Sequence, residues 1–127
     1  MKRLFSYLAA PKITKMLGSS TIRRFKGYQQ KKFRRQDGVF VAETPKVAEV
    51  LLQSSLPIEK VLAVESWWEN EKNQRLLLRW ERENGRQAEK IEISQKELER
   101  ISGLESPQEV WMLCRQPDTS LPGEETL

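Results

Sequence analysis

The sequence lacks histidine altogether and contains one cysteine, Cys114. Without histidine, neither a Ser-His-Asp nor a Cys-His nucleophile can form, and zinc sites that mix His with Cys are excluded. A single cysteine can make neither an internal disulfide nor a thiolate metal cluster, which is typical of a protein from a reducing compartment. We therefore expect a cytoplasmic protein without a bound metal.

Long apolar runs are also missing. The early uncharged run at residues 4–11 is followed closely by Lys12 and Lys15, and it is far shorter than the roughly 20 apolar residues of a membrane span. Glycine-rich phosphate-binding motifs such as Gly-x-Gly-x-x-Gly do not occur, so the sequence offers no cradle for a nucleotide cofactor. We expect a protein that neither crosses a membrane nor binds a cofactor within this chain.

Acidic residues are missing from the N-terminal part of the chain. Eleven of the 22 Lys and Arg residues precede Asp37, whereas none of the 18 Asp and Glu residues does. A basic segment beside an acidic body indicates a polyanionic partner, because one basic stripe is enough to hold phosphates. Nucleic acid fits this pattern best, and an anionic membrane or acidic protein is the weaker alternative.

Periodicity and turn residues predict one α/β domain with alternating helices and strands. Such an order favours a mainly parallel four-stranded sheet with helices on both faces, in three layers. Residues 1–18 are interrupted by Pro11 and Gly18 and are expected to form a mobile basic extension outside the core, and residues 117–127 have the composition of a linker. The expected helices span residues 19–36, 45–53, 69–84 and 95–101, and the expected strands span residues 39–42, 58–64, 89–93 and 110–114.

The expected helix at residues 19–36 has a cationic face. If it is continuous, Ile22, Phe25, Tyr28 and Phe33 fall within one broad face, and five cations fall within an arc of about 120° opposite Ile22, Phe25 and Phe33. A phosphate backbone relieves the repulsion between such charges, although the stripe could instead be a solvated face that docks on the acidic half of the chain. The predicted RNA-binding residues are Arg23, Arg24, Lys31, Arg34 and Arg35, with Lys26 and Lys32 on the flanks.

Three further features could carry chemistry, but a structural role is expected for each. Glu43 follows a strand, where α/β folds place functional groups, yet it lacks a partner acid and is expected to bind backbone N–H groups. Trp67 and Trp68 could stack bases, but they adjoin an amphipathic helix and are expected to pack in or beside the core. Cys114 lies in an apolar run and is expected to be a buried small hydrophobe.

Two phrases of the sequence resemble the substrate-binding domain of the SpoU/TrmH family of RNA 2′-O-ribose methyltransferases. The first is Lys31-Lys32-Phe33-Arg34-x-x-x-Gly38-x-Phe40-Val41-x-Glu43. The second is Ile101-Ser102-Gly103-Leu104-Glu105-Ser106-Pro107-Gln108, which runs into an apolar strand. Their order and separation match the family, and the resemblance covers roughly residues 17–115.

The resemblance implies a fold similar to that of kink-turn-binding ribosomal proteins. It also implies that this domain binds structured rRNA or tRNA beside a knotted methyltransferase domain. Residues 19–116 would be the RNA substrate-binding domain, with no catalytic residue of its own. The resemblance implies S-adenosylmethionine only for a C-terminal catalytic domain, and nothing after Arg115 matches the motifs of that domain. The RNA substrate-binding domain alone is expected to be monomeric. Met16 could replace Met1 as the initiator. The alternative is a complete, non-enzymatic RNA-binding module of the same fold.

The sequence departs from the family pattern at two turns. The family usually has Gly where this chain has Thr44, after Glu43, and again where it has Glu109, after Pro107-Gln108. Glycine permits backbone geometry that threonine and glutamate resist. Both turns are therefore expected to differ locally from those of the family.

Overall fold

The computed structural model describes residues 13, 14 and 16–117. Within these residues the elements follow each other with short connections, and most lie where the sequence predicts them. Their bounds are β1 Ile13–Thr14, α1 Ser19–Gly27, α2 Lys31–Asp37, β2 Val39–Glu43, α3 Pro45–Leu51, β3 Ile58–Ala63, α4 Glu65–Glu69, α5 Glu71–Asn84, β4 Glu89–Glu92, α6 Gln95–Ile101 and β5 Val110–Arg115.

Capping residues fix several of these ends. Thr44 accepts a hydrogen bond from the Val47 N–H and stands before Pro45 at the first turn of α3. Ser94 and Glu97 form a reciprocal capping box at the start of α6, and Gly85 ends α5 in the left-handed conformation. Each cap satisfies backbone groups that a helix end leaves free.

The sheet is mixed, so the expectation of a mainly parallel sheet was wrong, although the four expected strands are present and the two-residue β1 adds an edge strand. Five strands of the described residues lie in the order β1-β4-β3-β5-β2. β3 pairs in parallel with β4 and β4 with β1, whereas β5 runs antiparallel to both β3 and β2.

β5 begins at the end of the sheet where β3 and β4 finish, because Ala63 pairs with both Glu92 and Val110. Residues 102–109 therefore lead from α6 into β5 without crossing the sheet. By contrast α3, which also has seven residues, connects the parallel strands β2 and β3.

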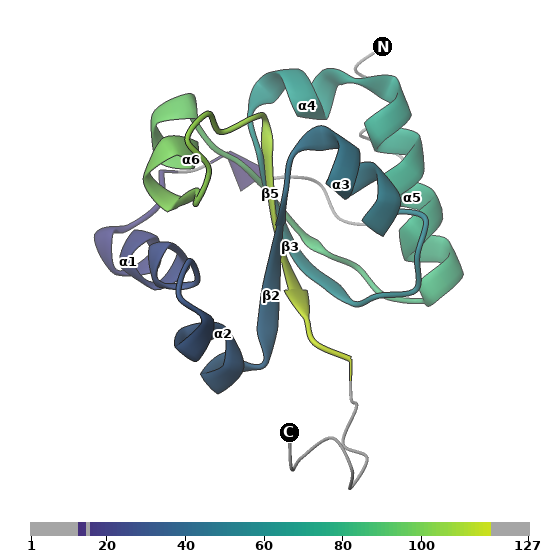
Figure 1. Ribbon diagram of the computed structural model, residues 1–127. Helices are drawn as coiled ribbons and strands as arrows, with labels where there is room; N and C mark the ends of the chain where they lie inside the picture. Colours follow the sequence, from purple (N-terminus) through teal and green to yellow (C-terminus); the bar gives the residue numbers. More distant parts are fainter. Residues whose placement is uncertain (1–12, 15, 118–127) are drawn as a thin grey trace, which may run out of the picture.

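Helices cover both faces of the sheet, which confirms the expected three layers. α1, α2 and α6 lie on one face, and α3, α4 and α5 on the other (Figure 1). Alternate residues of β5 point to opposite faces: Trp111 and Leu113 join the core with α1 and α6, whereas Met112 and Cys114 join the core with α3, α4 and α5.

The helix expected at residues 19–36 is two helices, so the assumption of continuity was wrong. Residues 28–30 form a turn between α1 and α2. Gly27, which disfavours a helix interior, is the last residue of α1, and Gly18 rather than a serine or threonine is its N-cap. The expected helix at residues 69–84 likewise begins only after Asn70, which caps α5 behind the separate α4.

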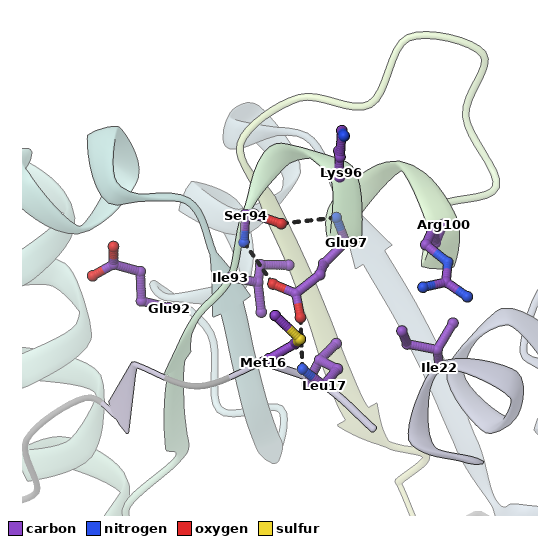
Figure 2. Close-up of a pocket in the computed structure, with 9 residues that line it drawn as sticks. All are labelled: Met16, Leu17, Ile22, Glu92, Ile93, Ser94, Lys96, Glu97 and Arg100. Atoms are coloured by element: carbon purple, nitrogen blue, oxygen red, sulfur yellow. Dashed lines mark hydrogen bonds between the residues drawn. The ribbon is translucent and has the colours of Figure 1, made fainter. Parts of the chain in front are cut away.

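The described part of the N-terminal extension is joined to the domain. Ile13–Thr14 adds an edge strand to β4, and Leu17 is 6% exposed within the core. Figure 2 shows how Glu97 holds this segment: one carboxylate oxygen accepts the Leu17 N–H at 2.6 Å, and the other accepts the Ser94 N–H at 2.9 Å. The expectation that residues up to Gly18 lie outside the core was wrong for Leu17. Residues 1–12 and 15 lie outside the described residues.

Candidate nucleic-acid interface

The predicted cations lie on α1 and α2, which share one face of the sheet. Because the chain turns at residues 28–30, the cations do not form the single stripe that a continuous helix predicts. Figure 1 shows α1 and α2 as separate segments at the edge of that face. We call the exposed parts of the two helices the cationic surface, and its predicted members are Arg23, Arg24 and Lys26 on α1 and Lys31, Lys32, Arg34 and Arg35 on α2.

Two of these cations hold the turn together. The Arg34 guanidinium donates to the Tyr28 carbonyl at 2.7 Å, across the break between the helices. Arg24 Nε donates to the Tyr28 hydroxyl at 3.1 Å, and that hydroxyl donates to Asp37 at 2.5 Å. The hydrogen bond to Tyr28 raises the pKa of Arg24, and burial raises the pKa of Tyr28, so both keep their protons at neutral pH. Arg24 and Arg34 are therefore structural as well as cationic.

The other cations of this surface are available to a partner. Within the described part of the chain, no hydrogen bond or ion pair engages the charged groups of Arg23, Lys26, Lys31 or Arg35, and all four are exposed. Lys32 lies above the Phe33 ring, with its ammonium 5.0 Å from the ring centroid. The alternative that this surface docks on the acidic half of the same chain finds no support among these contacts.

A hollow of about 510 Å³ opens at the turn between α1 and α2. Arg23, Arg24 and Lys26 stand on its α1 side, and Phe33 contributes an aromatic wall from α2. Phe33 is 37% exposed, so its predicted place on the packing face was wrong. The turn rotates α2 relative to α1, which removes Phe33 from the face that buries Ile22 and Phe25. We call this space the elbow hollow.

Glu43 has the structural role that the sequence predicts. Its carboxylate accepts hydrogen bonds from the Ser102 hydroxyl at 2.5 Å and from the Gly103 N–H at 3.0 Å, which ties the end of β2 to the loop after α6. Gln29 reaches the same loop from the α1–α2 turn, where its amide donates to the Ser102 carbonyl at 2.8 Å. The loop therefore holds the turn and β2 together.

Both turns that depart from the family pattern have a backbone conformation that favours glycine. Thr44 has φ = 75° and Glu109 has φ = 52°, and within the described residues these are the non-glycine residues with positive φ. Both residues therefore carry the strain of that conformation. Thr44 directly follows Glu43, so the strained residue adjoins the contact between β2 and the loop.

The remaining candidates are buried or absent. Trp67 and Trp68 are each 1% exposed, which confirms that they pack in the core. Cys114 is fully buried, and burial raises its pKa to about 12, so it is no nucleophile. The described residues contain no cluster of acidic or cysteine side chains suited to a metal ion, and none of the helices among them is long and apolar enough to cross a bilayer.

A sequence-family comparison finds one match. The model of the MRM3-like substrate binding domain matches residues 19–111, which include both helices of the cationic surface and most of the sheet. Among curated proteins, no sequence matches significantly.

Solved structures share the fold. An RNA 2′-O ribose methyltransferase superposes with a TM-score of 0.61 at 19% identity, over 86% of this chain and 40% of that one. A putative RNA methyltransferase of the TrmH family from Porphyromonas gingivalis gives 0.60 at 19% identity, over 82% and 37%. The SpoU methyltransferase AviRb from Streptomyces viridochromogenes, solved with AdoMet, gives 0.57 at 20% identity, over 83% and 38%. This chain thus spans about two fifths of the length of these proteins.

Proposed function

The chain belongs to the family of MRM3-like substrate-binding domains, and we propose that it holds structured rRNA or tRNA for a SpoU/TrmH-type 2′-O-ribose methyltransferase. The observation that carries this proposal is a surface of exposed cations, without acidic partners among the described residues, on a domain of this family. Contacts to phosphates fix the position of an RNA without reading its sequence. The role of this domain is therefore to position the substrate.

We assign the phosphate contacts to the cations that the fold leaves free. Arg23, Lys26, Lys31 and Arg35 are exposed and make no ion pair with a described residue. Lys32 adds a cation beside Phe33. Arg24 and Arg34 add positive potential, but their guanidinium groups are bound to Tyr28, so they contribute less to direct phosphate contact.

Methyl transfer itself needs S-adenosylmethionine, and the elbow hollow does not fit that cofactor. The elbow hollow is bordered by Arg23, Arg24 and Lys26, and these cations repel the positively charged sulfonium of the methyl donor. The cofactor and the catalytic residues therefore belong to another part of the enzyme in this proposal.

The finer parts of the proposal follow from the sequence. Residues 19–116 form the RNA-binding domain, which Ile13–Thr14 and Leu17 of the basic extension join, and residues 117–127 link it to its own C-terminal methyltransferase domain. We further propose a monomeric domain, a cytoplasmic location consistent with the free thiol of Cys114, and a likeness to kink-turn-binding ribosomal proteins. A complete non-enzymatic RNA module is not favoured, because the solved structures with this fold that we compare are methyltransferases.

Binding of a structured rRNA or tRNA fragment, followed by fluorescence anisotropy, tests the proposal. The double variant Arg23→Glu/Lys26→Glu removes two phosphate contacts and adds repulsion, so we expect its affinity to fall by about tenfold or more at moderate salt. Arg82→Glu/Arg86→Glu changes the net charge equally on exposed residues at the end of α5 and should bind as the wild type does. Equal losses of affinity in both variants would show that binding depends only on net charge. That result would overturn the assignment.

A further inference from the structure

The Phe33 ring is an exposed aromatic side chain surrounded by cations. Its exposed fraction is 37%, and it lines the elbow hollow together with Arg23, Lys26 and Asp37. A partner that covered the exposed part of the ring would gain the stability of burying it. Proteins that bind single-stranded nucleic acids place exposed aromatic rings among cations. The bases stack on the rings, and the cations neutralise the backbone.

We propose that the elbow hollow binds one unstacked RNA base against the Phe33 ring. This inference rests on the proposed function, because it assumes that the cationic surface holds RNA, and it adds a base-binding site to the phosphate contacts. The occupant is a nucleotide in a loop, bulge or single-stranded end, since a base within a duplex cannot leave its stack without a cost in free energy.

The Phe33 ring lies close to the backbone of α1 at Gly27. Gly27 has no side chain, and a Cβ atom at this position would lie 3.7 Å from Cδ2 of Phe33. A longer side chain at residue 27 would therefore occupy the space beside the ring. The hollow, of about 510 Å³, falls within the usual size of small-ligand sites.

Charge and hydrogen-bonding groups favour a nucleotide over an apolar peptide. Arg23 and Lys26 are exposed on the rim of the hollow, where they would meet the phosphates on either side of the base. Gln30, at the N-cap of α2, is exposed and also lines the hollow. Its amide carries both a donor and an acceptor for the edge of a base.

Two variants remove the base site without changing the charge. Phe33→Ala removes the ring, and Gly27→Leu fills the space beside it while replacing glycine by a better helix former. We expect each to weaken binding of a short single-stranded RNA by about 5- to 150-fold, the range measured for loss of one stacked base. Binding of heparin, which has charge but no bases, should stay within about twofold of wild type. Val50→Ala, which trims an apolar side chain that is 63% exposed on α3, is the matched control and should change neither.

The outcomes separate this inference from the proposed function. If wild type binds RNA and Arg23→Glu/Lys26→Glu weakens that binding, but Phe33→Ala and Gly27→Leu do not, the base site is wrong and the RNA function stands. If wild type fails to prefer RNA over heparin, the proposed function fails first. A direct readout uses RNA with a single 2-aminopurine: stacking on Phe33 should quench its fluorescence in wild type, and unchanged emission in wild type would also overturn the inference.

Discussion

The Glu81 carboxylate lies 2.6 Å from the Lys90 ammonium inside the core, where the two side chains are 3% and 0% exposed. The same carboxylate oxygen accepts the Ala88 N–H at 3.1 Å. Lys90→Met would leave Glu81 buried without its counter-charge, so we expect the free energy of unfolding to fall by about 3–5 kcal/mol. Urea denaturation measures the loss. Lys60→Met, which removes a partly exposed pair with Glu89, should cost less than about 1 kcal/mol.

A double variant separates the pair from its parts. Glu81→Leu/Lys90→Met replaces both charges by apolar side chains, and such replacements are often neutral or stabilising. We therefore expect the double variant to recover most of the stability that Lys90→Met loses. A double variant that remains as far below wild type in stability as Lys90→Met would show that the ion pair contributes net stability to this core.

The strained turns predict stabilising substitutions. Glu109→Gly relieves a residue at φ = 52°, and it sacrifices only an exposed hydrogen bond from Ser66. Thermal unfolding should show a gain of about 1 kcal/mol, because a left-handed conformation costs a non-glycine residue about 1–2 kcal/mol. Glu105→Gly, at an exposed position of the same loop without positive φ, should show no gain. A destabilised Glu109→Gly protein would mean that the turn is not strained.

Local sequence signals predicted most of the element ends because capping chemistry acts within a few residues. The Ser94–Glu97 capping box, Thr44 before Pro45, and Gly85 after α5 are local signals of this kind. The sequence also predicted the hydrogen-bonding role of Glu43.

Features that depend on distant parts of the chain were missed. The direction of β5 depends on its pairing with β2 and β3, which are distant in sequence, and the attachment of Leu17 depends on Glu97, 80 residues away in sequence. The break between α1 and α2 had one local signal, Gly27, but the cost of a glycine within a helix does not say whether the helix ends there. Phe33 was therefore placed in the core, and its exposure came only from the structure.

Glu97 makes the attachment of Leu17 depend on pH. Burial raises the pKa of the Glu97 carboxyl, but hydrogen bonds from the Leu17 and Ser94 N–H groups together lower it by more. The pKa in the folded state therefore lies below the ordinary value of 4.5. Because the pKa is lower in the folded state, the ionised carboxylate stabilises that state at pH values above the ordinary pKa. This contribution is lost as the pH falls through the pKa of the folded state. We expect the stability advantage of wild type over Glu97→Gln to be full at neutral pH and to shrink below pH ~4.5, as measured by urea denaturation. An advantage independent of pH would contradict this assignment.

Neighbouring arginines on α2 should separate structural from binding roles. Arg34 is half-buried and donates to the Tyr28 carbonyl at 2.7 Å, so Arg34→Met should lower the free energy of unfolding by about 1–3 kcal/mol by leaving that carbonyl without its charged donor. Arg35 is exposed, and Arg35→Met should leave stability within about 0.5 kcal/mol. If Arg35 contacts one phosphate, the same variant reduces the slope of log affinity against log salt by about 1.

Wild type itself fixes the scale for that comparison. With about four phosphates neutralised by Arg23, Lys26, Lys31 and Arg35, the slope of log affinity against log salt should lie between about −2.8 and −3.6. Titrations of a structured RNA at several salt concentrations measure it. A slope near zero would remove the cationic surface as the binding site, whereas a wild-type slope retained in full by Arg35→Met would remove only Arg35 from it. The two arginines differ by one position in sequence, so a reversal of their effects on stability would show that the contact between Arg34 and Tyr28 does not hold the turn.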